Sequence, residues 1–283
     1  MSPVHAKKSL GQNFLRSKEV VAHIVDVSDI FPGDLVVEVG PGEGALTNAL
    51  LNAGAHVIAV EKDRRCIPLL TDRFSDALED GHLILIEGDV LEKNITSELF
   101  NEILLGVPSY KVVANIPYYI TGLLFLYFLE EHRQPSQLTF LVQKEVAEQI
   151  VSHDKKESIL SLSIKVFGDP HIAGKVSREA FDPIPKVDSA ILIIKNIGKE
   201  KLGTLQEKDF FSIMKAGFRA KRKMLLGNLS LGLPYPKDEL LTLFTKLHID
   251  AKIRGEDLPI EMWIALATEI ATLRKKHLHK NLV

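Results

Sequence analysis

The segment "LVVEVGPGEGALTNALLNAG" (residues 35–54) runs from an apolar stretch, through three closely spaced glycines, into a helical pattern. The apolar part, residues 35–40, is rich in β-branched side chains and predicts a buried strand. Gly40, Gly42 and Gly44 follow, and glycines in this place allow a tight turn and a close approach of the backbone to a ligand. The segment therefore predicts a strand–turn–helix unit of an α/β fold.

The same alternation continues along the first two thirds of the chain. Further strands are predicted at residues 56–61, 83–89, 111–116, 138–143 and 190–196, with a weaker one at 171–177. Helical patterns lie between them, for example at 44–54, 66–78 and 121–132. Near-continuous apolar strands separated by helices indicate a doubly wound, parallel sheet with both faces covered.

The alternation ends near residue 197. The polar segment 197–209 indicates a linker, and three helical patterns follow at 209–229, 237–247 and 259–278. We therefore expect an α/β domain over residues 1–198 and a small, all-helical domain over residues 199–283.

The composition is that of an ordinary folded protein, with 46% hydrophobic and 25% charged residues. No apolar run approaches the about 18 residues of a membrane span, and the N-terminus has no apolar core of a signal peptide. The single cysteine, Cys66, allows no internal disulfide, which fits a reducing compartment. We expect a cytoplasmic protein without a membrane partner, and no metal, because the histidines form no convincing ligand set.

The net charge of −2 hides an uneven distribution. Residues 201–283 hold 15 Lys and Arg against 9 Asp and Glu, whereas the first 18 residues contain four basic residues and no acid. Such clusters can contact a phosphate backbone, although a solvated surface is the more common explanation. The candidate RNA-binding residues are Lys7, Lys8, Arg16, Lys18, Arg219, Lys221, Arg222 and Lys223.

Four polar residues fall at or near the ends of successive predicted strands. They are Glu38, Glu61, Asp89 and Asn115. Glu61 lies 21 positions after Gly40, where a carboxylate can accept hydrogen bonds from ribose hydroxyls. Because carboxylates disfavour a pyrophosphate, this crevice suits a nucleoside with a cationic centre, and we expect S-adenosylmethionine.

The segment "VVANIPYYIT" (112–121) supplies a site for the methyl acceptor just beyond the fourth strand. The exocyclic amine of adenine is a poor nucleophile because its lone pair is delocalised into the ring. Asn115 Oδ1 and the carbonyl of Ile116, whose direction Pro117 fixes, can accept hydrogen bonds from this amine and localise the lone pair. Tyr118 can stack on the base. No strong general base is then required.

At this point the chain resembles the ribosomal RNA adenine N6,N6-dimethyltransferases of the small-subunit (KsgA) type. The resemblance rests on "KSLGQNFL" (8–15), "VVEVGPGEGALT" (36–47), "NIPYYIT" (115–121), "LVQKEVAEQI" (141–150), "FDPIPKVDSAIL" (181–192) and "FRAKRKML" (218–225). It implies a Rossmann-like methyltransferase domain followed by a helical RNA-binding domain. It also implies that Phe181 stacks on the target base opposite Tyr118.

The resemblance and the strand ends together define the expected cofactor contacts. These are Asn13, Leu15, Glu38, Gly40, Gly42, Gly44, Glu61, Asp89, Val90 and Asn115. The implied substrate is a pair of adjacent adenines in the 3′-terminal hairpin of small-subunit (16S-type) rRNA, each methylated twice during subunit assembly by a monomeric enzyme.

Three alternatives remain at this stage. Methyltransferases that modify large-subunit rRNA and confer macrolide resistance share the glycine turn and the Asn-x-Pro-Tyr motif. A non-catalytic RNA-binding assembly factor would have no need of Asn115, Pro117, Tyr118 and Glu61. A nicotinamide oxidoreductase is disfavoured by the glycine spacing, which is one residue short of the dinucleotide fingerprint.

Overall fold

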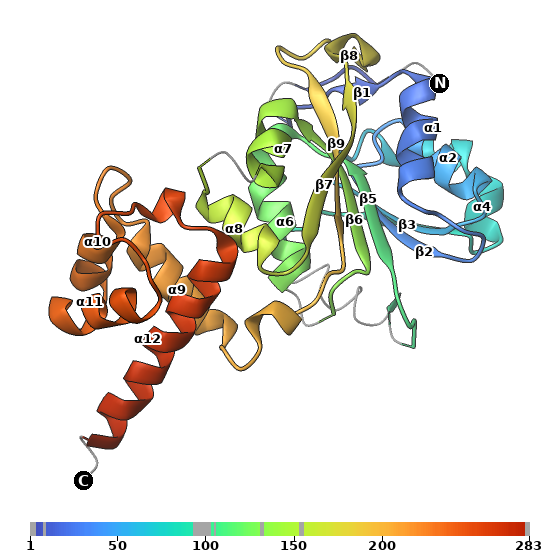
Figure 1. Ribbon diagram of the computed structural model, residues 1–283. Helices are drawn as coiled ribbons and strands as arrows, with labels where there is room; N and C mark the ends of the chain where they lie inside the picture. Colours follow the sequence, from blue (N-terminus) through green and yellow to red (C-terminus); the bar gives the residue numbers. More distant parts are fainter. Residues whose placement is uncertain are drawn as a thin grey trace. The chain divides into compact units, whose positions relative to one another are not determined.

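The computed structural model describes residues 4–7, 10–92, 103–104, 106–130, 133–152 and 156–280, without the side chains of residues 275, 276 and 278–280. The chain divides into two units (Figure 1). The first unit consists of Met1–Glu148 and Asp169–Ile197, and the second of Gln149–Gly168 and Gly198–Val283.

The first unit contains the sheet. In chain order its elements are β1 (Phe14–Leu15), α1 (Lys18–Val27), β2 (Leu35–Val39), α2 (Ala45–Asn52), β3 (His56–Glu61), α3 (Ile67–Arg73), α4 (Ser75–Glu79), β4 (Leu83–Glu87), β5 (Lys111–Asn115), the 3-10 turn η2 (Tyr118–Ile120), α6 (Thr121–Glu130), β6 (Gln137–Gln143), β7 (Asp169–Val176), η3 (Arg178–Ala180), β8 (Phe181–Asp182) and β9 (Ser189–Lys195). α7 (Lys144–Val151) crosses the division between the units. The seven predicted strands are all present, with ends that shift by at most two residues.

The strands form one seven-stranded sheet in the order β4-β3-β2-β5-β6-β9-β7. The pairs β4–β3, β3–β2, β2–β5 and β5–β6 are parallel, as the sequence predicts. The strand order changes direction between β2 and β5, so their carboxyl ends flank the switch point of the sheet.

The apolar side chains of the strands are buried on both faces because helices cover both. On one face, Leu46 and Leu50 of α2 share a core cluster with Val36 and Val113. On the other face, two phenylalanines of α6, Phe125 and Phe128, lie 4.9 and 6.3 Å from the ring of Phe140 in β6. Figure 1 shows α1 and α2 on one side of the sheet and α6 on the other.

The prediction of an entirely parallel sheet is wrong for the two strand pairs that involve β9. β9 pairs antiparallel with both β6 and β7. The connection from β7 to β9 contains only η3 and the two-residue strand β8. Because a parallel return needs a longer crossover, usually through a helix, the chain comes back in the opposite direction.

A second, two-stranded sheet has no counterpart in the sequence analysis. β1 pairs antiparallel with β8, with Phe14 opposite Asp182 and Leu15 opposite Phe181. The Arg16 N–H extends the contact by donating to the Ala180 carbonyl at 2.8 Å. This pairing fastens the N-terminal segment to the loop that precedes β9.

The second unit is helical. Its elements are α8 (Ile159–Lys165), η4 (Glu200–Leu202), α9 (Glu207–Gly217), α10 (Leu225–Gly232), α11 (Lys237–Lys246), η5 (Gly255–Asp257) and α12 (Ile260–Lys280). Its largest buried side chains are Phe167, Phe210, Phe244 and Trp263. The domain boundary predicted from sequence placed residues 149–168 with the sheet, whereas here they belong to the helical unit, where Phe167 packs 5.9 Å from the ring of Phe211.

The predicted helix over residues 209–229 is two helices, α9 and α10, separated by a turn. α9 ends at Gly217, where a Cβ atom would lie 2.4 Å from the Trp263 ring. Asn228 Nδ2 of α10 donates to the carbonyls of Gly217 and Ala220, at 2.6 and 3.0 Å, and so satisfies the backbone at the break. Within the described residues, no helix combines the length and apolar composition that crossing a bilayer requires.

Candidate active site

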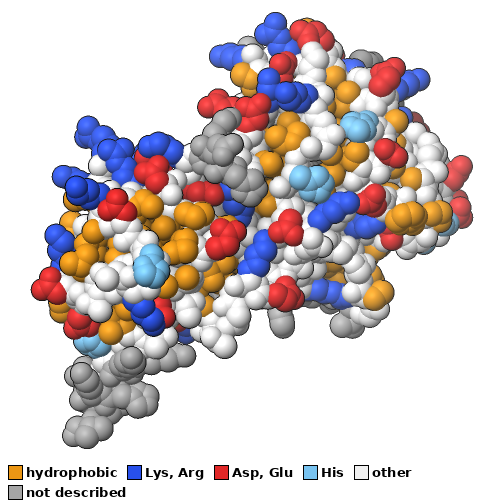
Figure 2. Space-filling model, viewed as in Figure 1, with side chains coloured by type: hydrophobic (Ala, Val, Ile, Leu, Met, Phe, Trp, Pro, Cys, Tyr) orange, Lys and Arg blue, Asp and Glu red, His pale blue; other side chains and the backbone are white. Residues whose placement is uncertain are grey.

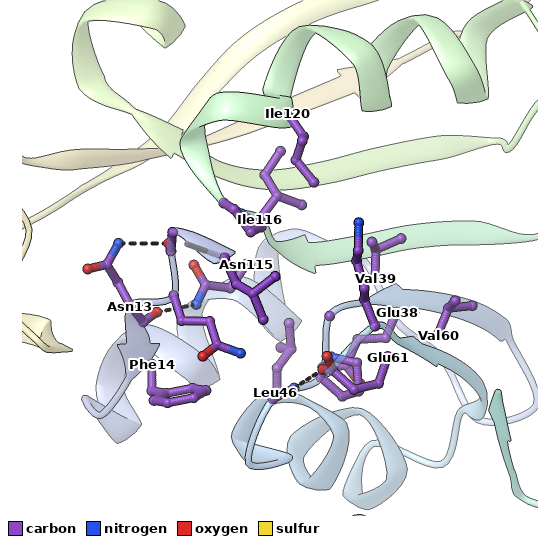
Figure 3. Close-up of a pocket in the computed structure, with 18 of the residues that line it drawn as sticks. Asn13, Phe14, Glu38, Val39, Leu46, Val60, Glu61, Asn115, Ile116 and Ile120 are labelled. Carbon is purple, nitrogen blue, oxygen red and sulfur yellow. Dashed lines mark hydrogen bonds between the residues drawn. The ribbon is translucent and has the colours of Figure 1, made fainter. Parts of the chain in front are cut away.

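A cavity lies at the carboxyl ends of the central strands, beside the switch point between β2 and β5 (Figure 3). Open α/β sheets bind their ligands at such points. The predicted residues that line it are Asn13, Leu15, Arg16, Glu38, Gly40, Gly42, Glu61, Asp89, Val90, Asn115, Ile116, Pro117 and Tyr118. The structure thus brings these residues together around one space, while their roles stay predictions.

The glycine turn after β2 shapes one wall of the cavity. Gly40 and Gly42 have φ angles of 70° and 58°, in the left-handed region that favours glycine. A Cβ atom on Gly42 would lie 3.0 Å from the Phe14 ring, so the turn also packs closely against the N-terminal segment. The Gly42 N–H donates to Glu61 Oε2 at 2.9 Å.

Gly44 is not among the residues that line the cavity, and its predicted contact with the cofactor stays a prediction. It precedes α2 with a φ of 81°. A Cβ atom here would lie 2.5 Å from the Phe74 ring and 3.0 Å from Leu70. Its lack of a side chain therefore allows the start of α2 to pack against Leu70 and Phe74.

Glu61, at the end of β3, is 5% exposed and accepts two backbone hydrogen bonds, from Gly42 N at 2.9 Å and from Asp63 N at 2.6 Å. Burial raises the pKa of this carboxyl, and the two N–H groups oppose the rise. A carboxylate has about four lone-pair positions, so two accepted bonds leave capacity for the hydroxyls of a ribose.

Glu38 is the most deeply buried acid of the cavity, with 1% of its surface exposed. Thr47 Oγ1 donates to its Oε2 at 2.6 Å. Burial raises the pKa of Glu38 to about 8; the Thr47 hydroxyl opposes this rise and the Glu61 carboxylate adds to it. Without a cation in the cavity the neutral form of Glu38 therefore dominates at pH 7.

Glu38→Gln is expected to make the stability of the cofactor-free protein less dependent on pH. The folded-state pKa of Glu38, about 8, lies above the ordinary value of 4.5, so the folded chain holds an extra proton between these values. This stabilisation is complete below the ordinary pKa and is lost as the pH rises to about 8, at about 1.4 kcal/mol for each pKa unit. Thermal unfolding between about pH 5 and about pH 8 measures the difference. Equal slopes for the variant and the wild type would contradict it.

Asp89 follows β4 and shares an ion pair with Lys62, whose Nζ lies 2.6 Å from Oδ2. The Leu91 N–H donates to Oδ1 at 3.0 Å. Partial burial opposes ionisation, but the contacts with Lys62 and Leu91 hold the pKa of Asp89 below its ordinary value. Next to it, Val90 is 2% exposed and gives the cavity an apolar surface.

The Asn-Ile-Pro-Tyr motif lies on the opposite wall, at the end of β5. Asn115 Nδ2 donates to the backbone carbonyl of Asn13 at 3.1 Å, as the dashed line in Figure 3 shows. Tyr118 is half-buried, and its hydroxyl shares a 2.7 Å hydrogen bond with Ser189 Oγ. Burial raises the pKa of Tyr118, so the ring is a neutral phenol.

Phe181 does not lie in the cavity, so the predicted pair of rings around the target base is not present in this structure. Its side chain is 3% exposed and belongs to the core cluster that includes Leu15, Val21, Ile24 and Val176. The pairing of β8 with β1 and the packing of α1 enclose the ring.

The basic candidates differ in their surroundings. Lys7 and Lys18 are exposed, Arg16 forms ion pairs with Glu43 and Asp182, and Lys8 lies outside the described residues. Arg219, Lys221, Arg222 and Lys223 are all exposed in the turn between α9 and α10. Figure 2 shows Lys and Arg side chains gathered on this part of the helical unit. Arg219 Nη1 also donates to the Leu231 carbonyl at 3.0 Å, so it stabilises the turn itself.

Several residues that line or support the cavity were not predicted from the sequence. Gln12, Glu43 and Lys62 line it, and Asp63 holds Gln12 through a 2.9 Å hydrogen bond. Gln12 lies within the motif "KSLGQNFL" and Glu43 within the glycine turn, so their positions were a usable signal. Asp63 gave none for this contact, because Gln12 lies 51 positions away in the sequence.

Comparisons with known proteins agree with this geometry. A family model described as ribosomal RNA adenine dimethylase matches residues 4–272. The chain is 41% identical over 266 residues to the ribosomal RNA small subunit methyltransferase A of Dehalococcoides mccartyi (strain CBDB1), with 94% of this chain and 89% of that protein covered.

Two solved structures share the fold. A dimethyladenosine transferase from Plasmodium falciparum superimposes with a TM-score of 0.74 at 24% identity, covering 92% of this chain and 98% of that one. The 23S rRNA methyltransferase ErmE gives a TM-score of 0.69 at 23% identity, covering 92% and 100%. At such identities the likeness shows the architecture alone.

Proposed function

Because the chain belongs to the ribosomal RNA adenine dimethylase family, we propose that it methylates two adjacent adenines, twice each at N6, in the 3′-terminal hairpin of small-subunit rRNA. The chain is an S-adenosylmethionine-dependent rRNA adenine dimethyltransferase with a Rossmann-like fold. The small-subunit substrate is supported by the name of the 41% identical relative. The observation that carries the proposal is that Asn115, Pro117 and Tyr118 line the same cavity as Glu61 and Asp89.

The cavity fits S-adenosylmethionine in its charge and its surfaces. Carboxyl groups of Glu38, Glu61 and Asp89 line it, which suits a ligand with a sulfonium and an ammonium group. Glu61 is placed for the ribose hydroxyls, and Val90 offers an apolar surface for the adenine ring. When bound, S-adenosylmethionine supplies a methyl group carried on a positively charged sulfur.

The Asn-Ile-Pro-Tyr motif makes the target amine reactive. The N–H groups of adenine N6 donate to Asn115 Oδ1 and to the Ile116 carbonyl, so the lone pair is drawn out of the ring and towards the methyl group. The ring of Tyr118 stacks on the base and orients it. With the cofactor bound, the N6–carbon bond would form as the bond between that carbon and the sulfonium sulfur breaks, and the sulfur would leave as a neutral thioether. N6 would then be cationic and would lose its proton to water. Positioning and electrostatics supply the rate, without a strong base.

The exposed basic residues are proposed to contact the phosphate backbone of the RNA. A target adenine must leave its stack to enter the cavity, and contacts elsewhere on the RNA offset that cost. The turn residues Lys221, Arg222 and Lys223 carry this role in the helical unit, and Lys7 and Lys18 carry it in the sheet unit.

Replacing Lys221, Arg222 and Lys223 together with alanine is expected to weaken binding to small-subunit rRNA and to reduce its salt dependence. Each lost phosphate contact lowers the slope of log K against log salt by roughly 0.7–0.9. Filter binding or fluorescence anisotropy over a range of salt concentrations measures the slope. In the matched control, Lys208, Lys215 and Lys237 are replaced with alanine. These lysines are also exposed on the helical unit, so the two triple variants lose the same charge. Equal slopes for the two triple variants would contradict the assignment.

Methyl transfer from labelled S-adenosylmethionine to small ribosomal subunits that lack the modification tests the proposed function. Large subunits and an Asn115→Ala variant are run beside them. Dimethyladenine in small-subunit rRNA, absent with the variant, is the expected result. Label in the large subunit would assign the enzyme to the other rRNA, and tight binding without transfer would identify an assembly factor.

A further inference from the structure

The N-terminal arm, defined as the described residues 4–7 and 10–16, forms part of the wall of the cavity and contacts both sides of it. On the side of the glycine turn, the Val4 N–H donates to Glu43 Oε1 at 3.1 Å. On the side of the Asn-Ile-Pro-Tyr motif, the Asn13 carbonyl accepts from Asn115 Nδ2 at 3.1 Å. The arm is therefore the segment that joins the cofactor side of the cavity to the proposed catalytic side.

The Asn13 carbonyl determines which way the Asn115 amide points. A carbonyl oxygen can only accept, so it selects the NH2 half of the amide and leaves Oδ1 on the other side of the group (Figure 3). With the amide rotated by half a turn, Oδ1 would face the Asn13 oxygen and the two acceptors would repel. Within the described parts of the chain, Asn115 Oδ1 makes no hydrogen bond. It is therefore available as the acceptor that the proposed mechanism needs.

The position of Asn13 depends in turn on two attachments. On its C-terminal side, β1 begins at Phe14 and pairs with β8. On its N-terminal side, Gln12 Nε2 donates to Asp63 Oδ2 at 2.9 Å. Gln12 Oε1 accepts from the Lys7 N–H at 2.8 Å, so the same side chain also closes the turn of the arm.

Asp63 is a rigid support for this contact. Its side chain is 2% exposed and forms a two-point ion pair with Arg65, at 2.6 Å to Oδ2 and 3.0 Å to Oδ1. Arg65 Nη1 reaches the carbonyl of His5 in the arm at 3.0 Å. The hydrogen bonds from Arg65 hold the pKa of Asp63 well below its ordinary range. Burial of the carboxylate opposes this shift, and a hydrogen bond from Gln12 adds to it. The Asp63 N–H also donates to Glu61 Oε1, so Asp63 is itself attached to a residue on the cofactor side of the cavity.

We propose that Gln12 and Asp63 are positioning residues for methyl transfer: their contact holds the Asn13 carbonyl where it aims Asn115 Oδ1 at the target amine. This inference rests on the proposed function. Neither residue needs to touch the reacting atoms. Losing the contact lets the arm move, and the Asn115 amide then samples orientations in which Oδ1 faces away from the amine.

Single-turnover methyl transfer at saturating S-adenosylmethionine and small subunits tests the proposal. Gln12→Ala is expected to lower the rate roughly 10- to 100-fold, the size expected when a reacting group is misplaced by about 1 Å. Calorimetry measures the dissociation constant of the Gln12→Ala variant for S-adenosylmethionine. This constant is expected to change less than about threefold, which is much less than the expected loss of rate. The control is His5→Ala, an exposed arm residue that offers Arg65 only its backbone carbonyl. A Gln12→Ala variant with weaker cofactor binding and an unchanged rate would overturn the proposal.

Exchanging the amide at position 12 with the carboxylate at position 63 gives a variant that is expected to recover the rate of methyl transfer. Gln12→Glu brings a second carboxylate to Asp63 and is expected to be as slow as Gln12→Ala. Adding Asp63→Asn restores a donor opposite an acceptor, with the same total charge and with Arg65 still beside both side chains. The double variant is expected to recover most of the rate. If the double variant stays as slow as Gln12→Glu, the hydrogen bond between residues 12 and 63 does not determine the rate, and the proposal is overturned.

A double-mutant cycle shows whether Gln12 acts through Asn115. In an Asn115→Ala background the amide is gone, so Gln12→Ala is expected to cause less than about a threefold further loss. Losses that multiply would assign Gln12 an independent, purely structural role and overturn the inference. The wild-type protein in the same assay separates the two proposals. Without dimethyladenine from the wild type, the proposed function itself fails, whereas an active wild type with a fully active Gln12→Ala removes only this inference.

Discussion

Asn115→Ala is expected to lower the single-turnover rate of methyl transfer by roughly 100- to 1000-fold, the usual cost of removing one group that stabilises a transition state. Asn115 offers the target amine its Oδ1, while its Nδ2 is held by the Asn13 carbonyl at 3.1 Å. Alanine removes the acceptor, so the lone pair of the amine stays in the ring. The side chain is partly exposed, and losing its hydrogen bond costs stability only about 0.5–1.5 kcal/mol.

The measurement is label transfer to small subunits under saturating conditions, with the melting temperature recorded in parallel. Asn52→Ala is the matched control, because Asn52 is exposed at the end of α2 and does not line the cavity. Its rate is expected to equal that of the wild type. If Asn115→Ala transfers methyl groups within about threefold of the wild type, far below the loss expected of a transition-state contact, the acceptor role assigned to this residue is wrong.

Phe181→Ala is expected to destabilise the sheet unit by roughly 3–5 kcal/mol, the usual cost of deleting a buried aromatic ring. Phe181 is 3% exposed and lies in the core cluster with Leu15 and Ile24. Chemical denaturation measures the change in the free energy of unfolding. The matched control is Phe31→Ala, because Phe31 is 64% exposed and its ring makes a cation–π contact with Lys111 Nζ at 5.4 Å. Its replacement is expected to cost about 1 kcal/mol or less.

A leucine at position 181 separates packing from stacking on the substrate. Leucine fills much of the same core volume, so Phe181→Leu is expected to fold and to methylate small subunits at a rate close to the wild type. A loss of more than about tenfold in rate, with little change in stability, would instead support the stacking role that the family resemblance implies. It would mean that the β1–β8 region opens when RNA binds.

Much of the lining of the cavity was predictable from sequence because its residues lie at or near the ends of strands. Glu38, Glu61, Asp89 and Asn115 each follow a recognisable apolar stretch, and parallel strands place their carboxyl ends at one edge of the sheet. Gly40 and Gly42 follow the same logic, since the turn after β2 must lie beside that edge. Periodicity and turn chemistry are local properties, so a single chain is enough to read them.

The features that the sequence did not predict depend on contacts between distant segments. The antiparallel direction of β9, the break between α9 and α10, and the burial of Phe181 and Gly44 each depend on a partner that local pattern does not name. Phe181 and Tyr118 were expected to face each other because they belong to motifs of one family. In this structure β1 and α1 enclose the Phe181 ring, and its stacking on the target base stays a prediction.

The sequence by itself determined the class of fold, the edge of the sheet where the cavity lies and the residues that we propose activate the amine. Tertiary structure alone decided which of those residues face the cavity, how the Asn115 amide is turned, and that Gln12 and Asp63 support it. The physical reason is the range of the interactions. Strand and turn preferences act between neighbours in the chain, whereas the orientation of Asn115 depends on a carbonyl 102 positions away in the sequence.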